Sequence, residues 1–319
     1  MTPHGLPSDL YHCLLDEQPY YLVPPRLLRQ PEIFGNVLIN PDCWFSWEGP
    51  PPPDKAERVE WNENFLPSDH IVWVEDPATH AIWPFWLGDE YFNYLRTMAP
   101  GRLVRQDIPC HVRWVLTQAN ILVASDTANQ RRRQWEEWVE GFAATFENGY
   151  VVLENLIHPF HIGALRRYYR HRVRRGFYSL GDEQVSRRFA SHNEGVARFV
   201  HHQLANAISE VSRADLKPSY AYFVSYLNGA ELQKHVDRAQ CDYSITACID
   251  ASPEPEDESP WPIELDTGPG TAKVFQSIGD ALIYRGCSVA HWREPLPRGL
   301  TSTSLLLHYV DQSFTGNLD

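Results

Sequence analysis

Cysteine is scarce in this chain, and the cysteines show no paired spacing. The 319 residues contain six cysteines, scattered singly, and no C-x-x-C motif. This spacing argues against a zinc ribbon and against the disulfide framework of a small secreted domain. The chain also lacks a glycine-rich phosphate loop and the G-x-S-x-G motif of many hydrolases. Several common enzyme classes are therefore disfavoured at the outset.

Long apolar runs and an excess of positive charge are also absent. No stretch approaches the eighteen consecutive apolar residues that indicate a transmembrane helix. The net charge of -13 argues against nonspecific nucleic-acid binding, which depends on a positive field. The first residues show no basic segment followed by an apolar one, so no secretory signal is expected. Together with the unpaired cysteines, these features predict a cytoplasmic protein without membrane or nucleic-acid partners.

Apolar and aromatic side chains are plentiful, but they are distributed in two different ways. Hydrophobic residues make up 43% of the chain, enough for one large or two medium domains. Nine of the eleven tryptophans precede residue 140. We expect residues 1–147 to form an aromatic-rich accessory region and residues 148–319 to form a separate domain. The accessory region either shapes a substrate cleft or only covers one face of that domain, and the sequence supports both equally.

The second half contains short strand-like segments separated by glycine and proline turns. β-branched and aromatic residues predict strands at 149–156, 219–227, 243–250, 281–284 and 302–310. Helical spacing predicts helices from residue 159 and over 194–211. This pattern predicts a mainly β, α+β fold whose core is a double-sheet jelly roll with flanking helices.

Three residues of the second half have the chemistry of metal ligands. Side chains at i and i+2 of a strand point to the same face of the sheet. His235 and Asp237 are therefore expected on the same face. His291 would add a second imidazole from a distant strand. Two histidines and one carboxylate leave adjacent metal positions open, as in non-haem Fe(II) oxygenases. The alternatives are a surface His235 paired with Asp237, and a buried structural His291.

The residues around this motif resemble the prolyl 4-hydroxylase-like branch of the 2-oxoglutarate- and Fe(II)-dependent dioxygenases. The resemblance covers residues 149–311, and Tyr226 lies nine positions before His235. The shared elements follow the order of that family: Tyr226, Gly229, His235-x-Asp237-Arg238, Gly279-Asp280-Ala281-Leu282, His291, Pro295 and Gly299.

This resemblance implies a double-stranded β-helix, a jelly roll like that of cupins, with Fe(II) held by His235, Asp237 and His291. It implies that 2-oxoglutarate binds the metal through its keto-acid end, with Tyr226 near one of its carboxylates. Dioxygen and 2-oxoglutarate would be consumed, succinate and carbon dioxide formed, and the substrate oxidised. Because Asp237 takes the position that a halide would need, hydroxylation is expected rather than halogenation.

One feature of that family is missing from this chain. The family usually anchors the far carboxylate of 2-oxoglutarate with a lysine or arginine about ten residues after the second histidine. That place is occupied here by Thr301-Ser302-Thr303. Among the nearby arginines we expect Arg298 to substitute, rather than Arg293 or Arg285, because a guanidinium binds a carboxylate with two hydrogen bonds. The alternative is that Arg298 is a solvated loop residue.

The expected function is hydroxylation of an amino-acid residue in a peptide or protein, or of a carrier-bound amino acid. A free amino acid or a small natural-product intermediate is the alternative substrate. Outside the enzymes, the alternative is a catalytically silent binding module on the same fold, because a fold does not dictate function.

Overall fold

The computed structural model describes residues 6–19, 21–28, 37–49, 53–56, 58–59, 62–104 and 107–319. The chain divides into two compact units. The N-terminal unit comprises 1–138 with 157–168, and the jelly-roll unit comprises 139–156 with 169–319. The expected boundary after residue 147 falls inside the segment 139–156, so the division does not correspond to a single cut in the sequence.

The N-terminal unit contains a small antiparallel sheet with the order β2-β3-β4. Its strands are β2 (Cys43–Phe45), β3 (Ile71–Glu75) and β4 (Ile82–Trp86). A separate pair joins β1 (Val37–Ile39) to β5 (Leu122–Ala124). The helices of this part of the chain are α1 (Pro53–Ala56), α2 (Asp89–Leu95), α3 (Cys110–Gln118) and most of α4 (Thr127–Phe146).

Most described tryptophans of the N-terminal unit are buried. Five of them are buried: Trp44, Trp73, Trp83, Trp86 and Trp135. The Trp44 and Trp73 rings stack across neighbouring strands, with centroids 5.9 Å apart. Large aromatic side chains bury much apolar area, so this composition stabilises the unit itself.

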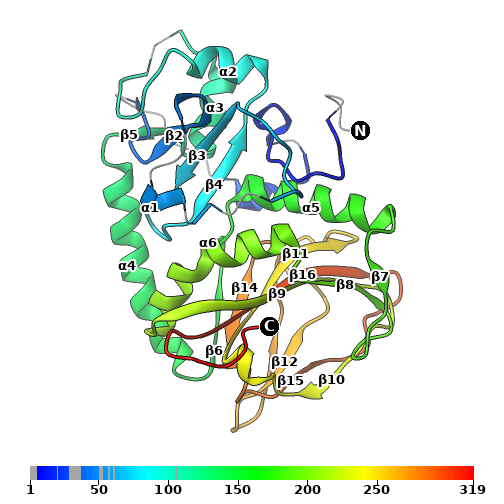
Figure 1. Cartoon of the computed structure of the whole chain (residues 1–319). Coiled ribbons are helices and arrows are strands. Elements are labelled where there is room, and N and C mark those ends of the chain that lie inside the picture. Colours follow the sequence, from blue (N-terminus) through cyan, green and yellow to red (C-terminus); the bar gives the residue numbers. More distant parts are fainter. Residues whose placement is uncertain are drawn as a thin grey trace. The chain divides into compact units, whose positions relative to one another are not determined.

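The jelly-roll unit consists of two antiparallel sheets (Figure 1). The larger has the order β6-β14-β11-β16-β9-β8-β7, and the smaller has the order β10-β15-β12-β13. The strands are β6 (Tyr150–Leu153), β7 (Ser179–Leu180), β8 (Arg188–His192), β9 (Leu216–Tyr226), β10 (Leu232–His235), β11 (Tyr243–Ser252), β12 (Ile263–Asp266), β13 (Thr271–Val274), β14 (Ala281–Tyr284), β15 (His291–Arg293) and β16 (Thr301–Asp311).

The path of the chain from β9 to β16 identifies the architecture. The strands β9, β11, β14 and β16 lie together in the larger sheet, while β10, β12, β13 and β15 form the smaller one. Eight strands that alternate between two sheets in this way form a double-sheet jelly roll, the double-stranded β-helix. The predicted mainly β fold with flanking helices is therefore confirmed.

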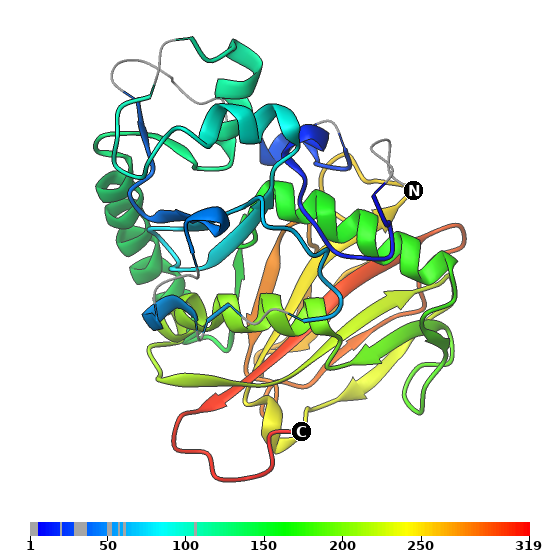
Figure 2. The same cartoon turned by 45° about the horizontal axis from the view of Figure 1, so that its top comes forward.

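Helices support the larger sheet from outside. Helix α6 (Gly195–Ser212) packs against β9 and β16, and Figures 1 and 2 show it along the sheet. It begins after Glu194, whose carboxylate accepts hydrogen bonds from the backbone N–H groups of Val196 and Ala197. Helix α5 (Pro159–Arg174) contributes Arg170, which forms a bidentate ion pair with Asp250 on β11. Within the described ranges, no helix is both long enough and apolar enough to cross a bilayer.

Candidate metal centre and its cavity

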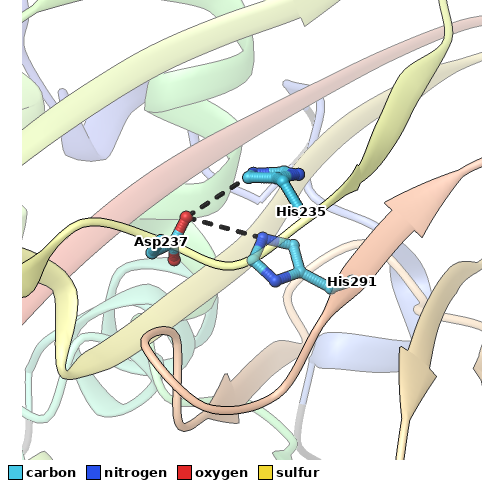
Figure 3. A group of neighbouring side chains, drawn as sticks. All are labelled: His235, Asp237 and His291. Carbon is cyan, nitrogen blue, oxygen red and sulfur yellow. Dashed lines mark ion pairs between the residues drawn. The ribbon is translucent and has the colours of Figure 1, made fainter.

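The smaller sheet brings the three predicted metal ligands together. His235 is the last residue of β10 and lies directly opposite His291, the first residue of β15. Asp237 follows β10 by two residues, and Figure 3 shows its carboxylate facing both imidazoles. One potential ligand atom from each residue lies within 4.8 Å of the other two. The H-x-D spacing places Asp237 near His235, and the register of β10 with β15 adds His291.

The spacing of these atoms leaves room for an ion. Asp237 Oδ1 lies 3.6 Å from His235 Nε2 and 3.6 Å from His291 Nε2 (Figure 3). Two ligands at about 2.1 Å from one metal, on adjacent positions, are roughly 3 Å apart. The three side chains therefore need only small movements to bind a common ion.

Hydrogen bonds to the backbone orient both imidazoles. His235 Nδ1 lies 2.8 Å from the carbonyl oxygen of Gln233, and His291 Nδ1 lies 3.1 Å from that of Val289. A ring that donates from Nδ1 keeps the lone pair of Nε2 available, as a metal ligand requires. At His235 that Nε2 lies 3.2 Å from the amide nitrogen of Gln184. The donor set and its orientation thus fit a divalent metal such as Fe(II).

The surroundings of Asp237 keep it ionised. Burial would raise the pKa of Asp237, but its interactions with the nearby His235, His308 and His291 lower it to about 2. Ser244 Oγ donates to Oδ2 at 2.6 Å, which directs Oδ1 towards the imidazoles. The same hydroxyl lies 2.9 Å from His308 Nδ1. Groups that orient a ligand in this way typically strengthen metal binding.

A tyrosine not identified in the sequence analysis also lies at this centre. The hydroxyl of Tyr284, on β14, is 3.3 Å from His291 Nε2. Burial raises the pKa of Tyr284, so the phenol is neutral and able to donate a hydrogen bond. Residue 284 falls within the predicted strand 281–284. Only the packing of the larger sheet against the smaller one shows that its side chain reaches His291.

The three candidate ligands line a cavity of about 770 Å³. This volume lies in the range of small-molecule binding sites. The lining also includes Tyr226 and three arginines, Arg188, Arg238 and Arg293. Arg298 is exposed and is not among the residues that line the cavity. The structure therefore brings together every predicted site residue except Arg298.

Arg293 is a buried cation whose partners are neutral. It lies two residues after His291 on β15, lines the cavity, and is only 5% exposed. Its Nη1 donates to the carbonyl oxygen of Trp261 at 2.8 Å, and its Nη2 to Gln276 Oε1 at 3.4 Å. In the part of the chain that the structure describes, no carboxylate forms an ion pair with it. An uncompensated buried charge costs several kcal/mol, so this site favours an anionic ligand.

Tyr226 and Arg188 also line the cavity and are hydrogen-bonded to each other. The hydroxyl of Tyr226 accepts a hydrogen bond from Arg188 Nη1 at 3.3 Å. Arg188 Nε donates to Asp182 Oδ2 at 2.6 Å, so the chain itself supplies its counter-charge. The positive charge of Arg188 is therefore neutralised by Asp182, whereas Arg293 has no carboxylate partner among the described residues.

No protein-family model and no curated protein match this chain. Solved structures do match its fold. They include the α-ketoglutarate-dependent non-haem epimerase SnoN from nogalamycin biosynthesis (TM-score 0.46, 10% identity, 55% of this chain and 83% of SnoN). A Pseudomonas putida prolyl-4-hydroxylase also matches (TM-score 0.44, 14% identity, 55% of this chain and 100% of that chain).

A third similar structure is HygX from Streptomyces hygroscopicus with nickel, 2-oxoglutarate and hygromycin B bound. Its TM-score is 0.42 at 13% identity, over 55% of this chain and 88% of HygX. At these identities the likeness concerns the fold alone, which the strand order of the two sheets establishes independently.

Proposed function

We propose that the jelly-roll unit is a 2-oxoglutarate- and Fe(II)-dependent oxygenase. The observation that carries this proposal is the convergence of His235, Asp237 and His291 on one wall of a cavity that also contains the uncompensated Arg293. Three ligands on one side of an ion leave positions open towards the cavity. A structural zinc site would instead need a closed set of four ligands.

Each residue has a definite role in this proposal. His235 and His291 would hold the iron through Nε2, and Asp237 through Oδ1. When bound, iron and 2-oxoglutarate supply the oxygen chemistry, in which the keto acid is converted to succinate and carbon dioxide. The residues of the chain orient these groups and exclude bulk water from the cavity.

Arg293 replaces Arg298 as the proposed anchor of 2-oxoglutarate. Arg293 is buried beside the metal ligands, whereas Arg298 is exposed and lies outside the cavity lining. The guanidinium lies 4.4 Å from the Trp261 ring centroid, which in turn lies 5.0 Å from the ring centroid of Tyr226. A carboxylate between Arg293 and Tyr226 would neutralise the buried charge.

The proposed reaction is hydroxylation of an amino-acid residue in a peptide or protein, or of a carrier-bound amino acid. Free amino acids and small natural-product intermediates are the alternative substrates of the same site. The cysteines of the described chain are all free, which suits the reducing cytoplasm proposed as its location.

Anaerobic titration with Fe(II) and 2-oxoglutarate tests the proposal. We expect a visible charge-transfer band from the ferrous keto-acid complex in the wild type and none in His235→Ala. His202→Ala is the matched control, because His202 is an exposed histidine of α6 outside the cavity lining. A wild type without a band indicates a silent binding module, and tight zinc binding without iron uptake indicates a structural site.

A further inference from the structure

The cavity lining contains a second arginine without a carboxylate partner, and this one is exposed to solvent rather than buried like Arg293. Arg238 directly follows the candidate ligand Asp237 and lines the same cavity. Its Nη2 donates to the hydroxyl of Tyr220 at 2.9 Å, and its guanidinium lies 5.1 Å from the centroid of that ring. Across the described residues, Arg238 forms no ion pair with a carboxylate. The tyrosine therefore positions the cation at the cavity wall and leaves its other donors available.

Aromatic rings pack around Tyr220, the residue that Arg238 contacts. The ring of Tyr220 has its centroid 5.7 Å from Tyr222, 5.2 Å from His192 and 4.7 Å from His308, and all of these residues line the cavity. Apart from the candidate ligand Asp237, the acidic side chains of the lining are Asp182 and Glu183, from the segment between β7 and β8. We call Arg238, Tyr220, Tyr222 and His192 the arginine–aromatic wall.

The arginine–aromatic wall is separate from the place proposed for 2-oxoglutarate. Arg238 contacts Tyr220, whereas Arg293 packs on Trp261. The Trp261 ring centroid lies 5.0 Å from that of Tyr226, which is six residues further along β9 than Tyr220. Six residues of a strand span about 20 Å. Arg238 therefore contacts a part of β9 away from the tyrosine assigned to 2-oxoglutarate, and it is available to a second ligand.

We propose that Arg238 binds a carboxylate of the substrate, whose carbon skeleton packs against Tyr220 and Tyr222. This inference rests on the proposed oxygenase function and narrows its substrate to a compound that carries a carboxylate. The carboxylate comes either from the free α-carboxyl group of an amino acid or from an Asp or Glu side chain within a peptide. Both sources present the planar anion that a guanidinium binds with two hydrogen bonds.

The test adds a panel of compounds to the anaerobic protein loaded with Fe(II) and 2-oxoglutarate. One arm contains N-acetyl amino acids and the corresponding N-acetyl amino-acid amides. The other contains peptides blocked at both ends, with a central Asp or Glu or with Asn or Gln in its place. Binding is read from the change in the charge-transfer band, and turnover from succinate formed after air is admitted.

We expect carboxylates to bind at least about tenfold more tightly than the matched amides, because a hydrogen bond to a charged group is lost. The arm that responds identifies the source of the carboxylate. Arg238→Gln should weaken this binding about ten- to a hundredfold, with the affinity for 2-oxoglutarate within about twofold of the wild type. Arg298→Gln, a matched loss of an exposed arginine outside the cavity, should bind the compounds as the wild type does.

Three results would overturn the assignment: equal binding of carboxylates and amides, wild-type binding by Arg238→Gln, or no response to any carboxylate of the panel. The retained 2-oxoglutarate band shows that Arg238→Gln is folded. A wild type that forms no band contradicts the oxygenase function itself, which separates the two failures.

Discussion

Each unit of this protein buries two arginines, and two of these four, Arg167 and Arg293, differ in their partners. Arg167, in the N-terminal unit, donates Nη2 to the carbonyl oxygen of His12 at 2.8 Å and lies 3.9 Å from the carboxylate of Glu17. Arg293, in the jelly-roll unit, has only neutral partners and faces a cavity. Burial lowers the pKa of both. A buried cation is structural where the chain supplies the anion, and indicates a ligand site where it does not.

The histidines of the two units differ in the same way. His161 is buried in the N-terminal unit, where Nδ1 contacts the hydroxyl of Tyr11 and the ring lies 4.8 Å from that of Trp83. His235 and His291 instead place Nδ1 on a backbone carbonyl and Nε2 towards Asp237. Two groups of potential metal ligands are found in the described chain, and both lie in the jelly-roll unit: His235, Asp237 and His291, and the overlapping group Asp237, Cys241 and His308.

Replacing Arg167 or Arg293 by methionine tests this comparison with the largest expected effect. Arg167→Met leaves the buried Glu17 carboxylate uncompensated and should lower the free energy of unfolding by about 3–5 kcal/mol. Arg293→Met removes a cation that has no counter-charge, so stability without 2-oxoglutarate should be unchanged or higher. Urea denaturation measures both. A larger loss of stability in Arg293→Met would contradict the comparison.

Removal of a metal ligand should have the next largest effect. Asp237→Ala should weaken Fe(II) binding by more than about a hundredfold, since loss of a group that merely orients a ligand already costs ten- to a hundredfold. His161→Ala, in the N-terminal unit, should keep the affinity of the wild type. Anaerobic calorimetry measures both affinities. Equal losses in the two variants would contradict the assignment of the metal centre to the jelly-roll unit.

The third prediction concerns which arginine, Arg293 or Arg298, anchors 2-oxoglutarate, and the expected change is a smaller one in the Kd of 2-oxoglutarate. Arg293→Gln should raise the Kd of 2-oxoglutarate about ten- to a hundredfold, because a charge-assisted hydrogen-bonded contact is lost. Arg298→Gln should leave the Kd unchanged, because Arg298 is exposed outside the cavity lining. Titration of the charge-transfer band measures both. The reverse result would restore Arg298 as the anchor.

The smallest effect concerns an internally paired carboxylate of the N-terminal unit. Burial would raise the pKa of Glu75, but hydrogen bonds with His80 and Lys55 lower it from 4.5 to about 2. The folded pKa lies below the unfolded one, so this stabilisation is present above pH 4.5 and is lost as the pH falls towards 2. The difference in Tm between wild type and Glu75→Gln should shrink over that interval. A difference independent of pH would contradict the pairing.

Sequence patterns predicted the larger sheet better than the smaller one. The segments 219–227, 243–250, 281–284 and 302–310 became β9, β11, β14 and β16, because β-branched and aromatic residues are common in long, buried strands. The strands β10, β12 and β15 are only three or four residues long and contain charged side chains. Their pairing depends on contacts distant in sequence, which no local pattern records.

The candidate site, too, could be predicted from the sequence only in part. His235, Asp237 and His291 were identified from residue type and spacing, and the structure brings them together. Arg293 was visible beside His291, but its significance depends on the absence of an acidic partner in three dimensions. The fork geometry of a guanidinium favoured Arg298, but every arginine shares that geometry. Only the structure shows that β15 places Arg293 in the cavity lining, while Arg298 is exposed outside it.

A crystal structure of the protein prepared anaerobically with Fe(II) and 2-oxoglutarate tests the account most directly. We predict one iron bound by His235 Nε2, Asp237 Oδ1 and His291 Nε2, with 2-oxoglutarate on the metal and its far carboxylate on Arg293. Iron bound elsewhere, an ion enclosed by four protein ligands, or a keto acid that does not reach Arg293 would contradict it.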